Sequence, residues 1–286
     1  MNNKKSVYLA LKDYSVSGEK FELLVNSELE MLETSPKPSL DKLPGYYESE
    51  EYISHTDSRK GVTDKLYQFV KSHALKNKLK LINSFKTSNK NLLDIGCGTG
   101  DFLITCLTNE WNVVGVEPNK NARELTNSKL DKNNLATIFK DVNELTSQKF
   151  DVITMWHVLE HVPNLDEYIL KLKQLLKPNG VLVVAVPNFK SFDAIYYKQF
   201  WAAFDVPRHL WHFSRKSISL LFKKYNLIVE KVLPMYFDSF YVSLLSEKYK
   251  TGKSNLVKAF IVGLRSNLKA ISTKEYSSLI YIIKNS

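Results

Sequence analysis

Hydrophobic residues beyond position 62 fall into short apolar runs that alternate with longer stretches of helical periodicity. Short runs predict strands, and stretches with an apolar residue every three or four positions predict helices. The expected strands are 91–95, 112–116, 136–139, 150–155, 180–186, 228–233 and 278–284. The expected helices are 63–85, one from 101, 120–129, 166–176 and 214–225. Strands that alternate with helices indicate an α/β fold with a mostly parallel sheet.

Two segments depart from this alternation. Residues 1–60 predict a hairpin of strands 21–25 and 31–33, followed by prolines and a stretch rich in tyrosine and carboxylates. We interpret this part as an N-terminal arm or a small β-rich subdomain, and residues 61–286 as the main domain. About 40 residues, roughly 235–275, separate the last two strands. Because hairpin loops are much shorter, we expect this insertion to be a lid or an interaction element.

Composition narrows the class of protein. Of 286 residues, 44% are apolar and 24% are charged, which is ordinary for a folded globular chain and excludes disorder or collagen. Two cysteines, Cys97 and Cys106, are too few for a disulfide framework or a structural zinc site. No signal peptide and no apolar run of membrane-spanning length is visible, so the expected compartment is the cytoplasm.

The net charge of +10 comes from 40 Lys and Arg against 30 Asp and Glu. Only five of the cations are arginine, and the lysines are spread along the whole chain. Nucleic-acid-binding surfaces cluster their cations and use arginine forks, so this pattern disfavours a nucleic-acid partner. It leaves open a weak attraction to a membrane surface or to an acidic substrate.

A glycine-rich turn follows the strand at 91–95. It reads Asp94-Ile-Gly96-Cys97-Gly98-Thr-Gly100 and opens a helix. Such a turn lets the backbone approach a ligand closely. A dinucleotide site is the first alternative, but its spacing is G-x-G-x-x-G, and nearby carboxylates would repel a pyrophosphate. Asp94 suits a cationic ligand better, and S-adenosylmethionine carries an ammonium and a sulfonium.

With these residues the sequence resembles the class I S-adenosylmethionine-dependent methyltransferases. Further motifs are similar to those of the family, with V-G-V-E-P at 114–118, the fourth-strand motif at 150–162 and L-K-P-N-G at 176–180. The D-I-G-C-G-T-G and H-V-L-E-H-V motifs also resemble those of quinone-biosynthesis O-methyltransferases. The resemblance implies a Rossmann-like fold with a seven-stranded, mostly parallel sheet, helices on both faces and an antiparallel last strand.

The resemblance also implies a cofactor site for S-adenosylmethionine. Glu117 would bind both ribose hydroxyls, since one carboxylate can accept two hydroxyl protons. Asp141 and Val142 would lie at the adenine, Trp156 would form a wall, and Tyr47 and Tyr52 would close over the sulfonium through a cation–π contact. The remaining expected cofactor residues are Asp94, Gly96, Cys97, Gly98, Gly100 and Pro118.

Histidine at the end of the fourth strand is the first catalytic candidate. A neutral imidazole at His157 could accept the substrate proton. His157-Val-Leu-Glu160-His161 also spells H-x-x-E-H, a zinc-protease signature. That motif needs a helix, whereas here it follows a strand and soon meets Pro163, so we expect no metal. His161 is open to a structural role.

A second catalytic candidate lies at 200–214, after the fifth strand, where open α/β folds bind ligands. Here Arg208 could hold a substrate carboxylate or phosphate, His209 could be the general base, and Asp205 could orient one of them. A loop pinned by a buried Arg–Asp pair is the alternative. Ser214 is expected to cap the next helix.

The predicted function is transfer of a methyl group from S-adenosylmethionine to an oxygen, or a nitrogen, of a small apolar or anionic acceptor. One alternative is an RNA methyltransferase, although the N-P-P-Y-like motif of base-amino enzymes is missing after the fourth strand. The other is a non-catalytic S-adenosylmethionine-binding protein. Aromatic residues in the 235–275 insertion could cover an apolar substrate or touch a membrane surface. The sequence predicts no oligomeric state.

Overall fold

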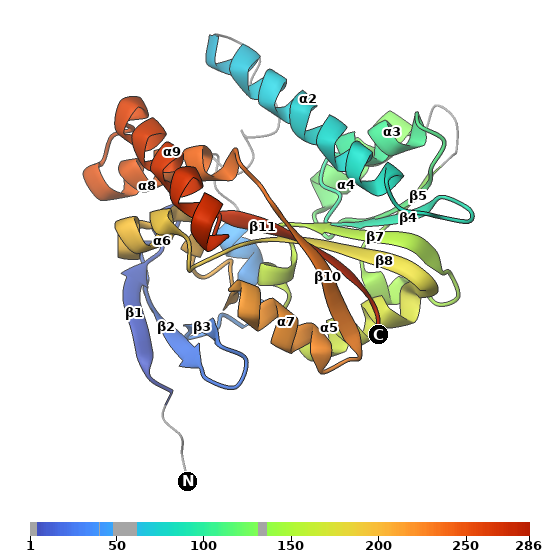
Figure 1. The fold of residues 1–286 in the computed structure, drawn as a ribbon, viewed down its shortest axis with the longest axis horizontal. Coiled ribbons are helices and arrows are strands. Elements are labelled where there is room, and N and C mark those ends of the chain that lie inside the picture. The colour runs from blue at the N-terminus through green and yellow to red at the C-terminus, as the bar shows by residue number, and fades with distance from the viewer. Residues whose placement is uncertain (1–4, 40, 48–61, 131–135) are drawn as a thin grey trace.

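A seven-stranded sheet runs through the centre of the computed structural model, which describes residues 5–39, 41–47, 62–130 and 136–286 (Figure 1). Strands β4 to β8 are parallel, and β11 is antiparallel to both of its neighbours. The sheet order is β10 (Leu227–Pro234), β11 (Ser278–Asn285), β8 (Leu176–Pro187), β7 (Phe150–Trp156), β4 (Asn91–Ile95), β5 (Asn112–Val116) and β6 (Ala136–Phe139). The predicted fold class is confirmed.

Helices cover both faces of this sheet (Figure 1). On one face lie α2 (Val62–Asn83), α3 (Asp101–Leu107) and α4 (Lys120–Leu130), and on the other lie α5 (Leu165–Leu175) and α7 (Arg215–Lys223). Alternate strand residues serve the two faces, as the two-residue period of a strand requires. Leu92 and Val152 pack with α3 residues, whereas Leu93 and Ile153 pack with residues of α5 and α7. The strands are therefore apolar almost throughout, as in sheets covered on both sides.

The N-terminal segment forms a second, antiparallel sheet of β1 (Val7–Lys12), β2 (Lys20–Asn26), β3 (Met31–Ser35) and β9 (Trp211–His212). The predicted hairpin corresponds to β2 and β3. Strand β1 was not predicted, because its side chains are mostly exposed and give no clear alternation. Strand β9 belongs to the second candidate segment, 200–214. It joins the N-terminal sheet because Leu32 of β3 pairs with His212.

The insertion between β10 and β11 is an antiparallel helical hairpin of α8 (Asp238–Thr251) and α9 (Leu256–Thr273). It packs on α6 (Phe192–Tyr197) and on the short turns η4 (Lys198–Phe200) and η5 (Ala202–Phe204). None of the helices in the described part of the chain has the length and apolar character needed to cross a bilayer.

Short 3₁₀ turns occur where the chain leaves a strand or enters a loop. They are η1 (Leu43–Tyr47), η2 (Val142–Glu144) and η3 (Leu159–His161). Strand β8 begins at Leu176, four residues before the expected start, because a register shift lets Leu176 pair with Phe150. Ser214 caps α7 as expected, with its hydroxyl accepting from the backbone N–H of Ser217.

Candidate active site

The glycine turn after β4 needs its glycines for two different reasons. A Cβ at Gly96 would lie 2.5 Å from Cγ2 of Val158, and one at Gly100 would lie 2.5 Å from Cγ2 of Thr126. Both residues also have φ near +70 to +80°, where glycine is favoured. Gly98 differs, because a Cβ there would meet nothing within 4 Å. Gly96 and Gly100 therefore serve close packing, while Gly98 leaves open space on the side of the turn.

Asp94 ends β4 as a buried carboxylate, 2% exposed. The Thr154 hydroxyl donates to its Oδ1 at 2.6 Å. Burial raises the pKa of Asp94 to about 6, against the opposing effects of Thr154 and the Lys78 cation. Lys78, on α2, also lies 4.3 Å from the ring centroid of Trp156. Sequence reasoning missed Lys78, because one lysine in a helix rich in lysines carries no distinguishing signal.

Glu117 follows β5 and is oriented by backbone donors. Its Oε2 accepts from the N–H of Gly98 and its Oε1 from the N–H of Asn119, both at 2.8 Å. Each oxygen keeps acceptor capacity, so the carboxylate can still take two hydroxyl protons. Cys97 is buried in the same turn, and burial raises the pKa of its thiol, which argues against a nucleophile. Pro118 is exposed.

The residues expected at the adenine lie after β6. The Asp141 carboxylate accepts from the N–H of Asn143 at 2.8 Å and caps η2, with Glu144 completing a capping box. Val142 is buried in the core. Asp141 therefore already has a structural role, and its expected contact with adenine stays a prediction. Tyr52 lies outside the described residues.

His157, the first catalytic candidate, stands between two carboxylates. Its Nε2 is 3.2 Å from Oδ2 of Asp238, and its Nδ1 is 3.4 Å from Oε1 of Glu160. Burial alone would lower the pKa of His157, but these two carboxylates raise it to about 10. His157 is then a cation at neutral pH rather than the neutral base that the sequence analysis expects. Asp238 begins α8, so the insertion reaches this site through an ion pair.

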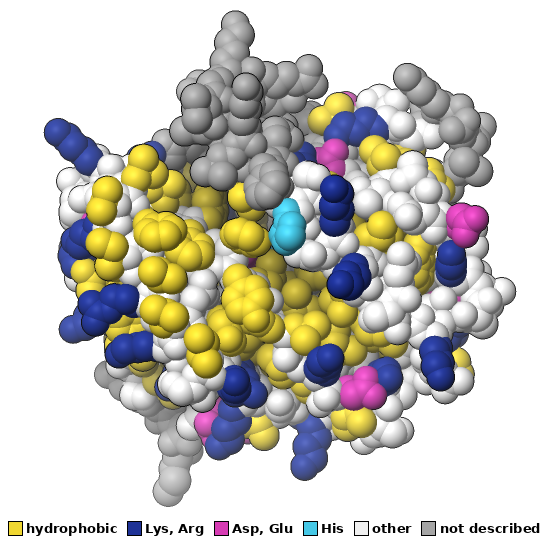
Figure 2. Space-filling view, turned by 45° about the horizontal axis from the view of Figure 1, so that its top comes forward, with side chains coloured by type: hydrophobic (Ala, Val, Ile, Leu, Met, Phe, Trp, Pro, Cys, Tyr) yellow, Lys and Arg dark blue, Asp and Glu magenta, His cyan; other side chains and the backbone are white. Residues whose placement is uncertain are grey.

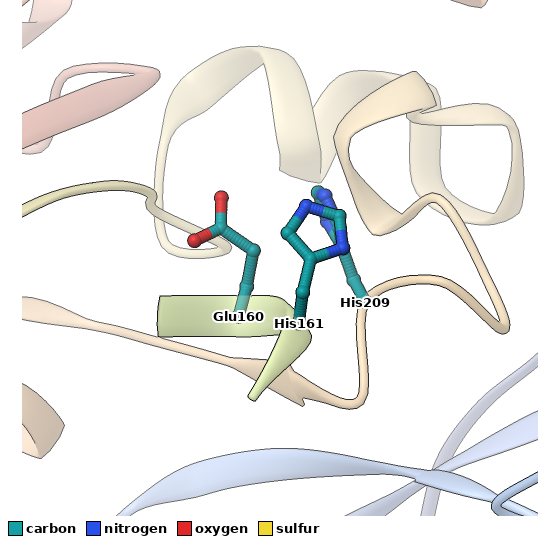
Figure 3. A group of neighbouring side chains, drawn as sticks. All are labelled: Glu160, His161 and His209. Carbon is teal, nitrogen blue, oxygen red and sulfur yellow. The ribbon is translucent and has the colours of Figure 1, made fainter. Parts of the chain in front are cut away.

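His161 and His209 lie together beside the end of β7 (Figure 3). Their ring centroids are 4.6 Å apart. Nδ1 of His161 lies 3.0 Å from the carbonyl oxygen of Arg208, and Nδ1 of His209 lies 2.9 Å from that of Ala203. Because carbonyl oxygens only accept, each Nδ1 donates, and each Nε2 is an acceptor when its ring is neutral. Nε2 of His209 lies 4.0 Å from Oδ2 of Asp205. Tyr47 joins the group, with its hydroxyl 3.0 Å from Nδ1 of His161.

Glu160 adds a third side chain of the metal-ligand type to these two histidines. Figure 3 shows its carboxylate beside the His161 ring, and ligand atoms of Glu160, His161 and His209 lie within 4.8 Å of one another. Such a set is close enough to hold a metal ion, which the sequence analysis did not expect. This set is not the one that the H-x-x-E-H signature would supply, because His209 takes the place of His157. Nε2 of His157 contacts Asp238 instead. A metal ion here would compete with His157 for the Glu160 carboxylate.

Arg208 is not available to a substrate. It is 3% exposed, and its Nη2 lies 2.7 Å from Oδ1 of Asp205 and 3.1 Å from Oδ1 of Asp13. Its other donors reach Oδ2 of Asp205, the carbonyl oxygen of Tyr46 and the hydroxyl of Ser15. The expected role of Arg208 as a substrate ligand is therefore wrong, and the alternative, a loop pinned by a buried Arg–Asp pair, is what the structure has. Asp205 does orient Arg208, as one of its two expected partners, but for a structural purpose.

The comparisons with known proteins agree with this geometry. A family model described as a methyltransferase domain matches residues 67–232, which is more than half of the chain. The chain belongs to this family. Its cofactor is S-adenosylmethionine, and the turn fits it, since Gly98 is open, Glu117 keeps acceptor capacity and Asp94 is a buried anion.

Curated relatives of this methyltransferase are named ubiquinone biosynthesis O-methyltransferases. The Rickettsia typhi protein is 32% identical over 104 residues, which cover 35% of this chain and 42% of that protein. The Pelagibacter ubique protein is 29% identical over 182 residues, covering 60% of this chain and 75% of the relative. The match to the Rickettsia proteins thus spans about two fifths of their length.

Solved structures share the fold of this methyltransferase. Magnesium protoporphyrin IX methyltransferase from Synechocystis PCC 6803 has a TM-score of 0.54 at 14% identity, covering 84% of this chain and 97% of that chain. A cyclopropane synthase from Mycobacterium tuberculosis has a TM-score of 0.55 at 15% identity, covering 87% of this chain and 99% of that chain. At such identities the likeness concerns the fold alone.

Replacing Arg208 by Ala should destabilise the methyltransferase by about 3–5 kcal/mol, because two carboxylates would lose their buried cation. Urea unfolding followed by circular dichroism measures this loss. Arg265→Ala, at an exposed arginine of α9, is the matched control and should change stability little. An Arg208→Ala protein as stable as that control would contradict a structural role for Arg208.

The ion pairs of His157 should stabilise the methyltransferase only while the imidazole is protonated. Its pKa is raised from 6.5 to about 10 on folding, so this stabilisation is complete below pH 6.5 and disappears as the pH rises toward 10. The melting temperature of His157→Gln should therefore fall below that of wild type at pH 6.5 and approach it near pH 10. A difference that stays constant over this range would show that His157 is not held as a cation.

Proposed function

We propose that this methyltransferase methylates a hydroxyl oxygen of a small, largely apolar acceptor, with His209 as the general base. The observation that carries the proposal is the histidine pair just after β7, in which Nδ1 of His209 lies 2.9 Å from the carbonyl oxygen of Ala203, so that Nε2 of a neutral His209 would be the free acceptor. The names of the curated relatives, which specify O-methylation in ubiquinone biosynthesis, support an oxygen acceptor.

The cofactor side of the reaction rests on three anchoring points. When bound, S-adenosylmethionine supplies a methyl group on a positively charged sulfur. Glu117 would accept from its ribose hydroxyls, and the Asp94 carboxylate would attract its ammonium group. The open side of Gly98 allows the ligand to lie against the backbone. The Lys78 cation is close enough to Asp94 to lower the pKa of that carboxyl. The ammonium group of the cofactor would have to displace Lys78 from the Asp94 carboxylate.

The acceptor side assigns different roles to the three histidines. His209 would take the hydroxyl proton at Nε2 while the acceptor oxygen takes the methyl group and the bond from that carbon to sulfur breaks. His161 is a poor base, because burial and the neighbouring His209 lower its pKa to about 4. His157 is a positioning residue, since as a cation it joins α8 to the end of β7 through Asp238 and Glu160. Holding the groups in place should supply most of the rate enhancement.

The apolar character of the acceptor follows from what the site offers. Arg208 donates its hydrogen bonds to Asp205, Tyr46 and Asp13, so it is not available to bind the anionic acceptor that the sequence analysis expects. Aromatic residues of the insertion remain at the site, and Phe237 contacts the His73 ring of α2 edge to face at 5.7 Å between centroids. An acceptor with an apolar body and a single reactive hydroxyl matches these surroundings.

Binding of S-adenosylmethionine should weaken as the pH falls through about 6, because Asp94 is ionised only above its raised pKa. Calorimetric titration across this range measures the dissociation constant. Asp94→Asn should bind at least about tenfold more weakly at pH 8 and lose the pH dependence. Glu117→Gln should bind weakly but keep the pH dependence. Equal affinities in Asp94→Asn and wild type would remove Asp94 from the site.

His209→Gln should lower kcat by about 10²–10⁴-fold, the usual contribution of a general base, with the affinity for S-adenosylmethionine unchanged. Formation of S-adenosylhomocysteine with prenylated phenols and catechols as acceptors measures the rate. Lys231→Gln, at an exposed lysine of β10, is the control and should leave kcat unchanged.

Three outcomes would contradict parts of this proposal. An unchanged kcat in His209→Gln would exclude His209 as the base. Activity lost on treatment with a chelator and restored by a divalent cation would assign Glu160, His161 and His209 to a metal ion instead. Binding of S-adenosylmethionine with no turnover of any hydroxyl acceptor would leave the cofactor site intact and overturn the O-methylation.

A further inference from the structure

Helix α9 carries its large apolar side chains on the outside of the molecule. Seven of them are between 41% and 71% exposed, namely Leu256, Val257, Phe260, Ile261, Leu264, Leu268 and Ile271. With 3.6 residues per turn these positions fall on one side of the helix. They form a continuous apolar strip, which we call the α9 strip.

The buried side of the same helix is made mostly of small residues. It consists of Ala259, Val262, Gly263, Ser266 and Ala270. Gly263 allows α9 to approach α8 closely, since a Cβ there would lie 2.7 Å from Cδ1 of Phe240. A surface helix of a globular protein normally turns its large apolar residues inward. Helix α9 has the reverse arrangement. Phe260 stacks on Phe240 of α8 at 5.3 Å between ring centroids but is still 58% exposed, so packing among the described residues covers the strip only in part.

Charge around the α9 strip has one sign. Between positions 252 and 274 the chain has five lysines and arginines and no aspartate or glutamate. Lys258, Arg265 and Lys269 fall beside the strip on the helical wheel. Figure 2 shows the apolar area over the hairpin, at the left of the view, with lysine and arginine side chains around its edge. Lys258 pairs with the buried Glu247 of α8 at 3.3 Å, so the net positive charge beside the strip comes mainly from Arg265 and Lys269. An apolar strip with cations beside it is the pattern of helices that lie in a membrane interface.

We propose that the α9 strip docks the protein on an anionic lipid bilayer, with α9 lying in the plane of the interface. Negatively charged lipid headgroups complement the cations beside the strip, while the apolar side chains enter the boundary of the acyl chains. A second copy of the chain fits less well, because a twofold contact sets the same patch against itself and would bring the cations together.

Docking through α9 would also place the active site beside the membrane surface. Asp238, the first residue of the preceding helix α8, lies 3.2 Å from Nε2 of His157. An apolar acceptor dissolved in the bilayer would then reach the site without crossing water. The docking itself does not rest on the proposed function, since vesicle binding requires neither cofactor nor acceptor.

Co-sedimentation of the full-length protein with lipid vesicles tests the proposal. Vesicles of phosphatidylcholine with phosphatidylglycerol should bind the protein, and vesicles of phosphatidylcholine alone should bind it at least about tenfold more weakly. The double variant Val257→Ser/Leu268→Ser, which changes two exposed residues of the strip, should lose about tenfold or more in affinity for the anionic vesicles. Arg265→Glu/Lys269→Glu, at two exposed cations beside the strip, should also lose binding.

A matched control separates the α9 strip from exposed apolar residues in general. Leu170 on α5 is 47% exposed and lies away from the hairpin, so Leu170→Ser should bind vesicles as wild type does. Circular dichroism shows whether each variant is folded, and S-adenosylmethionine titration shows whether its cofactor site is intact.

Three results would overturn the proposal. The first is wild-type protein that stays in the supernatant with anionic vesicles. The second is a Val257→Ser/Leu268→Ser variant that is folded and binds them fully. The third is a wild-type dimer, seen by analytical ultracentrifugation, that this variant dissociates, because the strip would then be covered by a second copy. The S-adenosylmethionine and turnover assays are read separately, so failure of docking leaves the proposed O-methylation untouched.

Discussion

The buried arginine at position 208 holds together three parts of the chain that carry the site. Its guanidinium binds Asp13, directly after β1 of the N-terminal sheet, and Asp205 in its own loop, while its carbonyl oxygen accepts from Nδ1 of His161. A buried cation is tolerated only when its partners stay in place, so the three parts cannot move independently. The position of His209 next to His161 is a consequence of this constraint, because His209 follows Arg208 directly.

A second long-range contact connects the helical hairpin to the central sheet. His157 directly follows strand β7, and Asp238, 81 positions later in the sequence, begins α8. Nε2 of His157 lies 3.2 Å from Oδ2 of Asp238. Small residues on the inner side of α9 let the hairpin pack closely, and its large residues are left outside. The helical hairpin thus supplies the Asp238 carboxylate that pairs with His157, and it also carries the exposed α9 strip. The site and the strip therefore share one packed element.

The central sheet could be predicted because its signals are local. Apolar runs such as 180–186 and the glycine spacing after Asp94 depend on neighbours in the sequence. Contacts between distant residues left no such signal. Nothing in the sequence pairs Arg208 with Asp13, singles out Lys78 among the lysines of α2, or joins the two-residue strand β9 to β3. The helices of the 235–275 insertion were not predicted, and an apolar stripe such as that of α9 does not say whether it faces the core or the outside.

Two histidines of one short motif differ in charge for a reason that the sequence alone does not contain. His157 has carboxylates on both ring nitrogens, and its pKa is raised to about 10. His161, four residues later, faces a backbone carbonyl and another histidine, and burial lowers its pKa to about 4. Between these values the first stays cationic and the second stays neutral, so the charge of the pair is constant over the neutral range. The cation can then hold the hairpin in place while the neutral imidazole of His161 lies beside His209, so one short motif carries both a charged and a neutral ring.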